Sequence, residues 1–354
     1  MTYRAAVIGA GRIGLALEAD DRRPKPATHA GMWMHHPATE LAALCDVVPE
    51  FEAVAREIAP EARCYGDIDE MLSAERPDIV SIATHQDSHV AVARRAIDAG
   101  VKAIACEKPI SDDLSTAQAL VTEAAGAGVH LIVNHARRFD PALRTLASNL
   151  QNGVIGEVLQ VTGYYVYGLI STGTHLIDLL RMTLTPFAGD VSWVAAWPNR
   201  MIHHHPDGDI CVDGVIGFES GLKANIQSLD MRSYDHFELR YYGRSGLVTF
   251  DGLQRRIDYY EDVDAGTRSG FRELSATPLR SEANPDNSYF AFLADHLVDC
   301  LGGNATVASS GEDSVHALAI LQAMSQSAER GGEVVTLTEC ADVGLHSVAA
   351  LAKG

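Results

Sequence analysis

The sequence predicts an α/β chain in which a doubly wound parallel sheet comes first and an α+β domain follows. Short apolar runs alternate with segments of helical period up to about residue 135, and strand-like alternation takes over beyond residue 155. The chain has 354 residues, and single hydrophobic cores rarely grow beyond about 300 residues. We therefore expect two domains, at residues 1–135 and 136–354.

Five short apolar runs are the strand candidates of the first domain, at residues 5–8, 41–45, 79–83, 103–106 and 130–133. A helix is expected at residues 88–99, because Val90, Ala93 and Ile97 recur at helical spacing and Gly100 is a good C-cap residue. This order of elements is typical of β-α-β units in a parallel sheet.

The second domain has strand candidates at residues 158–166, 191–197, 211–218, 222–229 and 236–242, which should pair mostly antiparallel. Helices are expected at 174–182, 287–301 and 311–330, and surface loops at 20–26 and 262–287, where Gly, Pro, Ser, Asp and Asn gather.

Composition limits the classes of partner. The chain carries 28 Lys and Arg against 47 Asp and Glu, a net charge of -19, which disfavours nucleic acid and anionic membranes and favours a small molecule. The N-terminus lacks the pattern of a signal peptide, so we expect a cytoplasmic protein. The six cysteines form no close pair, which predicts reduced thiols rather than disulfides or a zinc site.

A glycine pattern after the first strand indicates a dinucleotide site. In the turn 9–14, Gly9 allows a tight turn, Gly11 allows a pyrophosphate to approach the backbone, and Gly14 allows the following helix to pack on the strand. Arg12 and Ile13 lie in the same turn and are expected to contact the cofactor. An ordinary strand-to-helix turn is the alternative.

An acidic residue should follow the second strand and bind the ribose hydroxyls, and Asp46 occupies that position. It lies farther from the glycines than the usual spacing of about 20 residues, and the loop at 20–26 accounts for the excess. Asp46 could instead cap a helix. Because Val47 and Val48 follow, with no arginine for a 2′-phosphate, NAD is favoured over NADP.

Cys106-Glu107-Lys108-Pro109 ends the fourth predicted strand and places Lys108 at the sheet edge where ligands bind. A solvated lysine before a helix is the alternative. Three further motifs follow in order: Asn134-His-Ala-Arg-Arg-Phe-Asp-Pro-Ala142, Gly156-Glu-Val158 and Gly173-Thr-His-Leu-Ile-Asp-Leu-Leu-Arg181. Together they resemble the Gfo/Idh/MocA family, which includes glucose-fructose oxidoreductase and inositol dehydrogenase.

The resemblance covers nearly the whole chain and implies an NAD(P)-dependent dehydrogenase acting on CH–OH groups. It implies a Rossmann domain, a C-terminal domain with a large open sheet, and a sugar, sugar derivative or polyol bound between them. A homodimer or homotetramer is implied as well, because family members commonly associate through that open sheet.

By position, Lys108 matches the family's active-site lysine and His175 its proton-accepting histidine. A lysine ammonium can stabilise a developing oxyanion, and histidine titrates near neutrality as a general base must. A buried structural histidine is the alternative. Asp178, on the same helix face as His175, could orient the imidazole or the substrate, or pair with Arg181.

The sequence departs from the family at Ser171, where many members carry an aspartate. A serine cannot stabilise an imidazolium as a carboxylate does, which puts the proton path in question. Arg138 and Tyr167 could bind hydroxyls or a carboxylate of the substrate; the alternatives are an interdomain salt bridge for Arg138 and a packed aromatic for Tyr167. By position, the residues expected near the cofactor also include Thr84, His85, His89, Glu107 and Lys108.

Three consecutive histidines, His203 to His205, invite a metal interpretation. Neighbouring strand residues point to opposite faces and cannot all reach one ion, so no metal is expected. The resulting hypothesis is hydride transfer between NAD and a sugar or polyol. The alternatives are a glycosidase that oxidises its substrate transiently with tightly held NAD, and a dinucleotide-binding regulatory protein that has lost catalysis.

Overall fold

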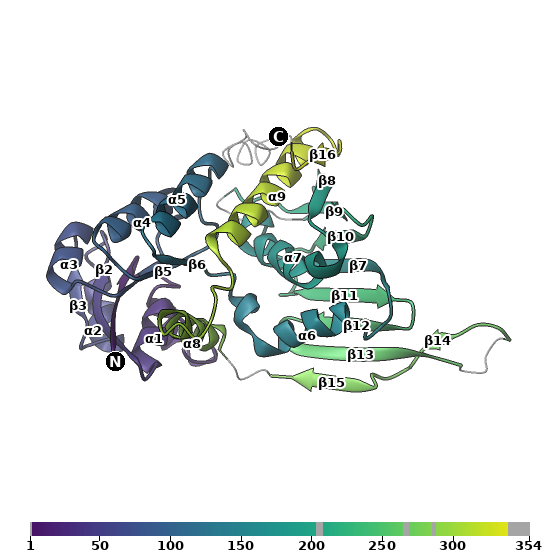
Figure 1. The fold of residues 1–354 in the computed structure, drawn as a ribbon, viewed down its shortest axis with the longest axis horizontal. Helices are drawn as coiled ribbons and strands as arrows, with labels where there is room; N and C mark the ends of the chain where they lie inside the picture. Colours follow the sequence, from purple (N-terminus) through teal and green to yellow (C-terminus); the bar gives the residue numbers. More distant parts are fainter. Residues whose placement is uncertain (1, 203–207, 265–268, 285–287, 339–354) are drawn as a thin grey trace. The chain divides into compact units, whose positions relative to one another are not determined.

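The computed structural model describes residues 2–202, 208–264, 269–284 and 288–338, which form two compact units (Figure 1). The first unit comprises residues 1–140 and 286–318, and the second comprises 141–285 and 319–354. The division thus differs from a single boundary at residue 135, because the segment 286–318 returns to the first unit.

The first unit is built on a six-stranded parallel sheet with the order β3-β2-β1-β4-β5-β6. Its strands are β1 (Tyr3–Ile8), β2 (Thr39–Cys45), β3 (Arg63–Tyr65), β4 (Ile79–Ile82), β5 (Ala103–Cys106) and β6 (His130–Val133). The five predicted strands are confirmed within two residues. The prediction missed β3, which has three residues and no apolar run.

Helices cover both faces of this sheet, as the doubly wound prediction requires. Helices α4 and α5 pack together on one face and α1 and α8 on the other (Figure 1). The helices of the unit are α1 (His29–His35), α2 (Phe51–Ile58), α3 (Ile68–Glu75), α4 (His89–Asp98), α5 (Leu114–Gly126) and α8 (Tyr289–Leu301). Helix α4 confirms the predicted helix at 88–99.

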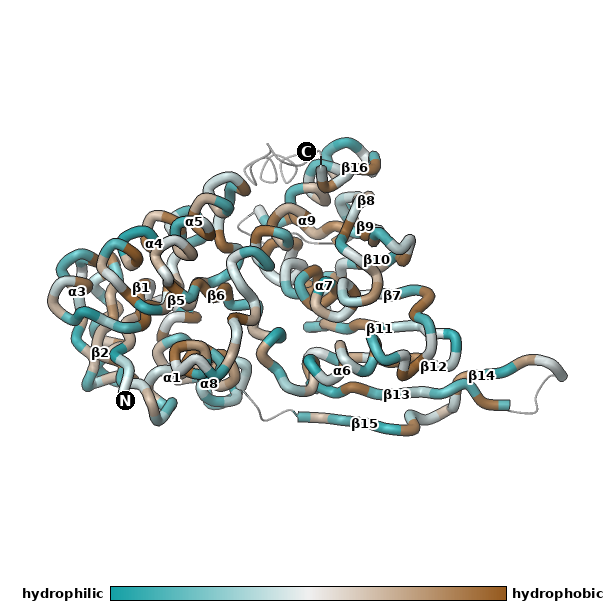
Figure 2. The backbone as a smooth tube through the Cα atoms, in the orientation of Figure 1, coloured by the Kyte–Doolittle hydropathy of each residue, from teal (hydrophilic) through white to brown (hydrophobic). Residues whose placement is uncertain are grey.

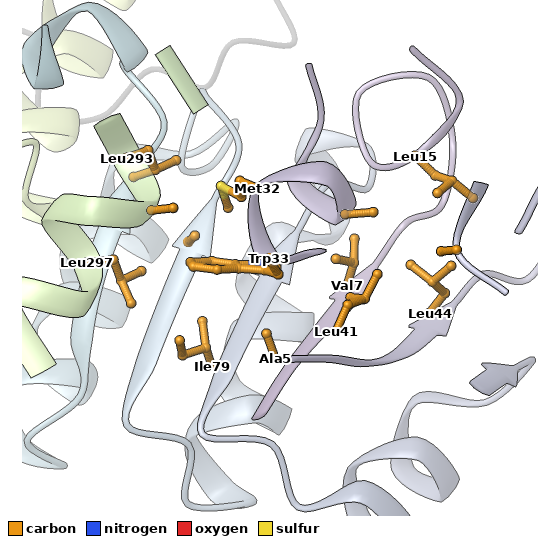
Figure 3. Close-up of a cluster of buried hydrophobic side chains, with 14 of the residues drawn as sticks. Ala5, Val7, Leu15, Met32, Trp33, Leu41, Leu44, Ile79, Leu293 and Leu297 are labelled. Carbon is orange, nitrogen blue, oxygen red and sulfur yellow. The ribbon is translucent and has the colours of Figure 1, made fainter. Parts of the chain in front are cut away.

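The core beneath the sheet explains why residues 286–318 belong to the first unit. Figure 3 shows Trp33 of α1 within a cluster of buried side chains, with Leu293 and Leu297 of α8 close to it. The indole Nε1 of Trp33 also donates a hydrogen bond of 2.8 Å to Ser81 Oγ. Helix α8 therefore completes this core, although it follows the second unit in sequence.

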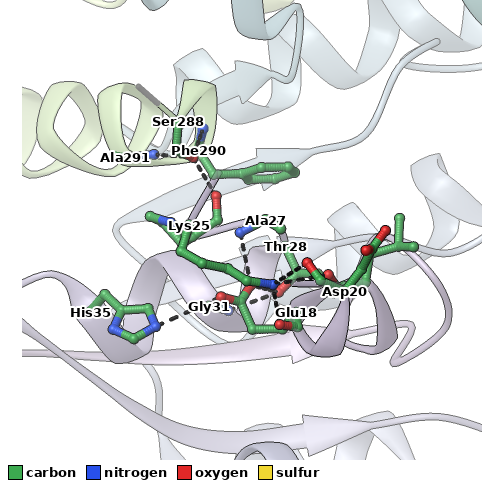
Figure 4. Close-up of polar contacts among 12 residues, drawn as sticks. Glu18, Asp20, Lys25, Ala27, Thr28, Gly31, His35, Ser288, Phe290 and Ala291 are labelled. Atoms are coloured by element: carbon green, nitrogen blue, oxygen red, sulfur yellow. Dashed lines mark hydrogen bonds and ion pairs between the residues drawn. The ribbon is translucent and has the colours of Figure 1, made fainter. Parts of the chain in front are cut away.

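The chain between the glycine turn and α1 is an ordered loop (Figure 4). A 3-10 helix, η1 (Ala16–Ala19), begins it. The largely buried Glu18 carboxylate accepts hydrogen bonds of 2.8 Å from Ala27 N and Thr28 Oγ1, and Lys25 Nζ donates to the carbonyls of Glu18 and Asp20. Residues 20–26 contain neither helix nor strand, as predicted.

Helix α1 stacks on the glycine turn across this loop. His29 N donates to Ile13 O at 3.1 Å and Ala30 N donates to Gly14 O at 2.9 Å. In a continuous helix these carbonyls would accept hydrogen bonds from the residues four positions later. The start of α1 therefore continues the hydrogen bonding of the glycine turn, as the second turn of one helix would, although residues 15–28 separate the two segments.

The second unit is built on a large, mostly antiparallel sheet, on which α6 and α7 pack together (Figure 1). The strand order is β14-β13-β12-β11-β7-β10-β9-β8-β16, and β15 pairs with β13. Among the described strands of this second sheet, β7 and β10 are the only parallel neighbours. Its strands are β7 (Val158–Tyr165), β8 (Val191–Pro198), β9 (Val212–Phe218), β10 (Lys223–Ser228), β11 (Glu238–Gly243), β12 (Gly246–Asp251), β13 (Arg256–Val263), β14 (Glu273–Leu274), β15 (Arg280–Ala283) and β16 (Val335–Thr336).

The remaining helices are α6 (Pro141–Gln151), α7 (Thr174–Ala188) and α9 (Gly311–Glu329). Helix α7 extends six residues beyond the predicted end. The expectation of a loop at 262–287 is wrong for β14 and β15, although 265–268 and 285–287 lie outside the described residues. These two strands are short and largely exposed, and β15 is mainly hydrophilic, so they lack the alternation that predicts a strand (Figure 2).

The five cysteines other than Cys340 are free thiols, and Cys64 is the only one of them that is not fully buried. None of the described helices is long and apolar enough to cross a membrane.

Candidate functional site

A cavity of about 810 Å³ lies at the carboxyl ends of β1, β2 and β4. The strand order reverses at β1, and open parallel sheets bind ligands at such a switch point. Seven of the predicted cofactor residues line the cavity: Gly9, Gly11, Arg12, Ile13, Asp46, Thr84 and His85. The structure thus brings the glycine turn, Asp46 and the loop after β4 together around one cavity.

The three glycines differ in what surrounds them. A Cβ at Gly9, whose φ is +92°, would lie 2.5 Å from Ala83 C, and one at Gly14 would lie 1.9 Å from Gly9 O. No atom lies within 4 Å of a Cβ built on Gly11. Gly9 and Gly14 are therefore required by the fold of the turn, whereas Gly11 leaves open space beside the cavity for a cofactor.

The expectation that an α-helix follows the turn directly is wrong. Residues 12–15 form turns, in which Leu15 N and Ala16 N donate to Gly11 O at 3.0 Å, before η1 begins. Among the described residues, none accepts a hydrogen bond from the backbone N–H groups of 11–14. Such unpaired N–H groups at the start of a helical turn suit an anion, so the turn fits a pyrophosphate without a regular helix.

Asp46 follows β2 and contacts the glycine turn. Its Oδ2 accepts a hydrogen bond of 2.8 Å from Ala10 N, and its Oδ1 accepts one of 3.0 Å from Val48 N. One oxygen therefore fixes the turn and the other fixes the loop after β2. The carboxylate still lines the cavity, where a ribose hydroxyl could donate to it.

Sequence reasoning missed the apolar part of the cavity. Leu17, Val47, Val48 and Ile68 come from three separate segments and line it together. Val47 and Val48 are exposed, at 82% and 54%, so both side chains are accessible to a ligand in the cavity. The sequence did contain a signal for this apolar wall, since Val47 and Val48 directly follow Asp46 and belong to no predicted strand or helix.

His89 and Ser88 hold the loop after β4. The ring nitrogens of the buried His89 lie 2.9 Å from Pro109 O and 3.1 Å from Thr84 O, and Ser88 Oγ donates to Thr84 Oγ1 at 2.7 Å. Burial lowers the pKa of His89, which keeps the neutral imidazole favoured. His89 does not line the cavity but connects its Thr84 wall to the loop that carries Lys108.

Glu107 is the centre of a buried polar network directly before Lys108. Its Oε1 lies 2.9 Å from His29 Nε2 and 2.7 Å from Asn134 Nδ2, and its Oε2 accepts from Lys108 N at 3.3 Å. Burial opposes ionisation, but the hydrogen bond and charge of His29, the charge of Lys108 and the hydrogen bond of Asn134 together lower the pKa of Glu107 to about 2. The carboxylate is anionic at neutral pH and fixes the Lys108 loop.

The lowered pKa of Glu107 predicts a pH-dependent contribution to stability. Relative to the ordinary value of 4.5, the folded state favours the anion, so the contribution is complete above pH 4.5 and is lost as the pH falls toward 2. The shift corresponds to a contribution on the order of 3 kcal/mol. In urea unfolding, Glu107→Gln should therefore be less stable than wild type at pH 7, with a smaller difference at pH 3.5.

Glu123→Gln is the control for this measurement, because Glu123 forms an exposed ion pair with Arg94. Exposed pairs contribute little, so this variant should match wild type at both pH values. A Glu107→Gln deficit that is equal at pH 7 and pH 3.5 would show that charge is not what stabilises the network.

Lys108 and Arg138 lie in the first unit but do not line the cavity. Lys108 follows β5, the strand beside β4, and is half-buried. Arg138 Nη1 lies 3.1 Å from Asp313 Oδ2 of the same unit. This ion pair lies within the first unit, whereas the alternative considered for Arg138 was an interdomain salt bridge.

The remaining predicted residues belong to the second unit. A π-helical turn, η4 (Leu169–Gly173), follows β7 and contains Ser171, and α7 begins with Thr174 and carries His175 and Asp178. Asp178 is buried, and Arg181, its suggested partner, lies 3.9 Å from Asp190 Oδ1. Tyr167 precedes η4 rather than lying on a strand.

The described residues contain no group of three metal-binding side chains, and the histidines at 203–205 lie outside them.

A model of a protein family described as "Oxidoreductase family, NAD-binding Rossmann fold" matches residues 3–135, the segment that contains the cavity. Two relatives extend the similarity through the second unit. D-apiose dehydrogenase from Paraburkholderia graminis is 28% identical over 330 residues, covering 86% of this chain and 85% of that protein. Inositol 2-dehydrogenase from Rhizobium meliloti is 28% identical and covers 92% of this chain and 97% of that protein.

Solved structures agree in fold. Levoglucosan dehydrogenase in complex with NADH has a TM-score of 0.75 and 18% identity, with 95% of this chain and 99% of that chain covered. At this identity the likeness shows that the architecture of both units is shared.

Proposed function

Because the chain belongs to the Gfo/Idh/MocA family and is an NAD-dependent dehydrogenase acting on CH–OH groups, we propose that its substrate is a secondary alcohol or ketone of a sugar, sugar derivative or polyol. The observation that carries this proposal is the cavity at the carboxyl ends of β1, β2 and β4, with Lys108 on the loop after the neighbouring strand β5. The names of the two relatives, which refer to apiose and inositol, favour a polyhydroxylated substrate.

The first unit holds the cofactor in this proposal. The N–H groups of residues 11–14 bind the pyrophosphate, Asp46 accepts from a ribose hydroxyl, and Thr84 and His85 lie along the cavity toward β4. When bound, NAD supplies the nicotinamide carbon that accepts or returns the hydride. The guanidinium of Arg12, which has no partner among the described residues, adds positive charge beside the pyrophosphate.

The proton and the developing charge are handled by two side chains. The Lys108 ammonium donates a hydrogen bond to the substrate oxygen and stabilises negative charge as its proton leaves. The His175 imidazole accepts that proton, since histidine exchanges protons near neutral pH. Asp178, one turn later on α7, orients the imidazole, while Ser171, Tyr167 and Arg138 offer hydrogen bonds to further hydroxyls.

A panel of sugars, sugar acids and polyols, followed by the absorbance of reduced nicotinamide with NAD or NADP, tests this function. We expect at least one polyhydroxylated substrate to reduce NAD, and His175→Gln to abolish most of that turnover. The control is His130→Gln, because His130 lies at the amino end of β6, whereas the cavity lies at the carboxyl ends of the strands. Full turnover in His175→Gln would refute its proton role. Cleavage of a glycoside without accumulating NADH would replace the dehydrogenase assignment by the glycosidase.

A further inference from the structure

The backbone before His175 has an unusual conformation. Tyr167 and Gly168 have φ values of 73° and 116°, and the chain then forms the π-helical turn η4 before α7 begins. A positive φ is uncommon for tyrosine and costs on the order of 1 kcal/mol, so surrounding contacts must maintain it. Single π-turns of this kind are frequent at functional sites.

Asp209 supplies those contacts from the segment before β9. Its Oδ1 accepts a hydrogen bond of 2.9 Å from Ile170 N, and its Oδ2 accepts one of 2.7 Å from Ser171 N. Leu169 N donates to Ile210 O at 2.8 Å, so three consecutive N–H groups of η4 are bound by residues 209–210. The start of a helical segment leaves these N–H groups without internal partners, and a carboxylate satisfies two of them at once.

The carboxylate is held tightly in place. Asp209 is only 7% exposed, and a Cβ at Gly168 would lie 2.5 Å from Asp209 Cγ, so the side chain packs against the glycine backbone. The buried Tyr165 hydroxyl donates to Val212 O at 2.7 Å and accepts from Val212 N at 3.0 Å, which fixes the segment after Asp209 to β7. The two segments in contact are therefore both attached to β7: η4 follows this strand in sequence, and the segment with Asp209 is hydrogen-bonded to its Tyr165.

We propose that Asp209 is the positioning residue of His175. Its carboxylate fixes η4, and η4 sets where α7 begins and where the imidazole, two residues after Gly173, is presented. It also brings a negative charge to the backbone of Ser171, one turn before His175, where the side chain itself is neutral. The inference rests on the proposed proton role of His175.

Asp209→Ala and Asp209→Asn test the proposal against Asp213→Asn. Asp213 is the matched control because it is a nearby carboxylate whose described hydrogen bonds go to Ser228 N and Oγ at 2.8 Å and to Asn199 Nδ2 at 3.1 Å, outside η4. We expect Asp209→Ala to lower kcat by about 10- to 100-fold, as small displacements of a reacting group do, with the Kd for NAD unchanged. Asp209→Asn, which keeps one acceptor oxygen and the shape, should be intermediate, and the control should match wild type.

Amide hydrogen exchange of the peptide that spans residues 168–173 provides a readout independent of activity. Exchange should rise in Asp209→Ala and remain at the wild-type level in Asp213→Asn. Wild-type exchange and wild-type kcat in Asp209→Ala would overturn the proposal. Raised exchange with unchanged kcat would also overturn it, because η4 would then be loosened without consequence for His175. If His175→Gln itself retains full turnover, the proton role has failed, whereas the exchange data still show whether Asp209 holds η4.

Discussion

Replacing Lys108 by alanine is expected to lower kcat by a factor on the order of 10² to 10³, the usual cost of removing one donor to a developing oxyanion. The reason is that Lys108, the proposed donor to the substrate oxygen, follows β5, the neighbour of β4, on a loop fixed by the buried Glu107 network. Lys108→Arg keeps the positive charge but changes the donor geometry and should restore only part of the activity. Steady-state kinetics with the best substrate of the panel measure both effects.

Lys102→Ala is the matched control, because Lys102 precedes the amino end of β5, whereas Lys108 follows its carboxyl end, and it pairs with Asp78 at 2.7 Å. Its kcat should equal that of wild type. The Kd for NAD of Lys108→Ala, measured by fluorescence titration, separates the two roles considered for Lys108. A weakened Kd with unchanged kcat would make Lys108 a cofactor ligand rather than a donor to the substrate oxygen.

Gly14→Ala and Gly11→Ala should differ sharply in stability although both change one glycine of the same turn. The added Cβ at residue 14 would lie 1.9 Å from Gly9 O, a backbone atom that cannot rotate away, so the turn must shift. We expect a loss of more than about 3 kcal/mol in unfolding free energy, the upper range for overpacking. At residue 11 the new methyl group meets no atom within 4 Å, and stability should stay near that of wild type.

The same pair should separate in cofactor binding. Gly11→Ala places its methyl group beside the cavity, where we propose that the pyrophosphate binds. It should weaken NAD binding by about tenfold or more while the protein remains folded. Urea unfolding and NAD titration of both variants check this. Equal stability of the two variants would contradict the distinct packing described for Gly14.

The fold was predictable where short apolar runs are buried on both faces, as in β1, β4, β5 and β6. Pattern reasoning failed for β3 and β15, which are short, polar and stabilised by pairing with a neighbouring strand rather than by their own burial. It also failed for the place of α8, because nothing local to residues 289–301 reveals that they pack against Trp33.

The candidate site shows the same limit. The glycine turn and Asp46 are local signals with a fixed spacing to strands, and the structure brings them to one cavity. The contacts of Asp209 with η4 and of His29 with Glu107 join segments that are 38 and 78 residues apart. No spacing rule connects such segments, so only the folded chain reveals which polar groups support Lys108 and which support the turn before His175.

The hydrogen bonds from His29 and Ala30 back to Ile13 and Gly14 mean that residues 15–28 leave a helical axis and return to it. The geometry of the glycine turn is consequently independent of the length of the loop 15–28. A shorter or longer loop at this point would leave α1, β2 and Asp46 in place, so the number of residues between the glycines and Asp46 does not by itself set their relative positions.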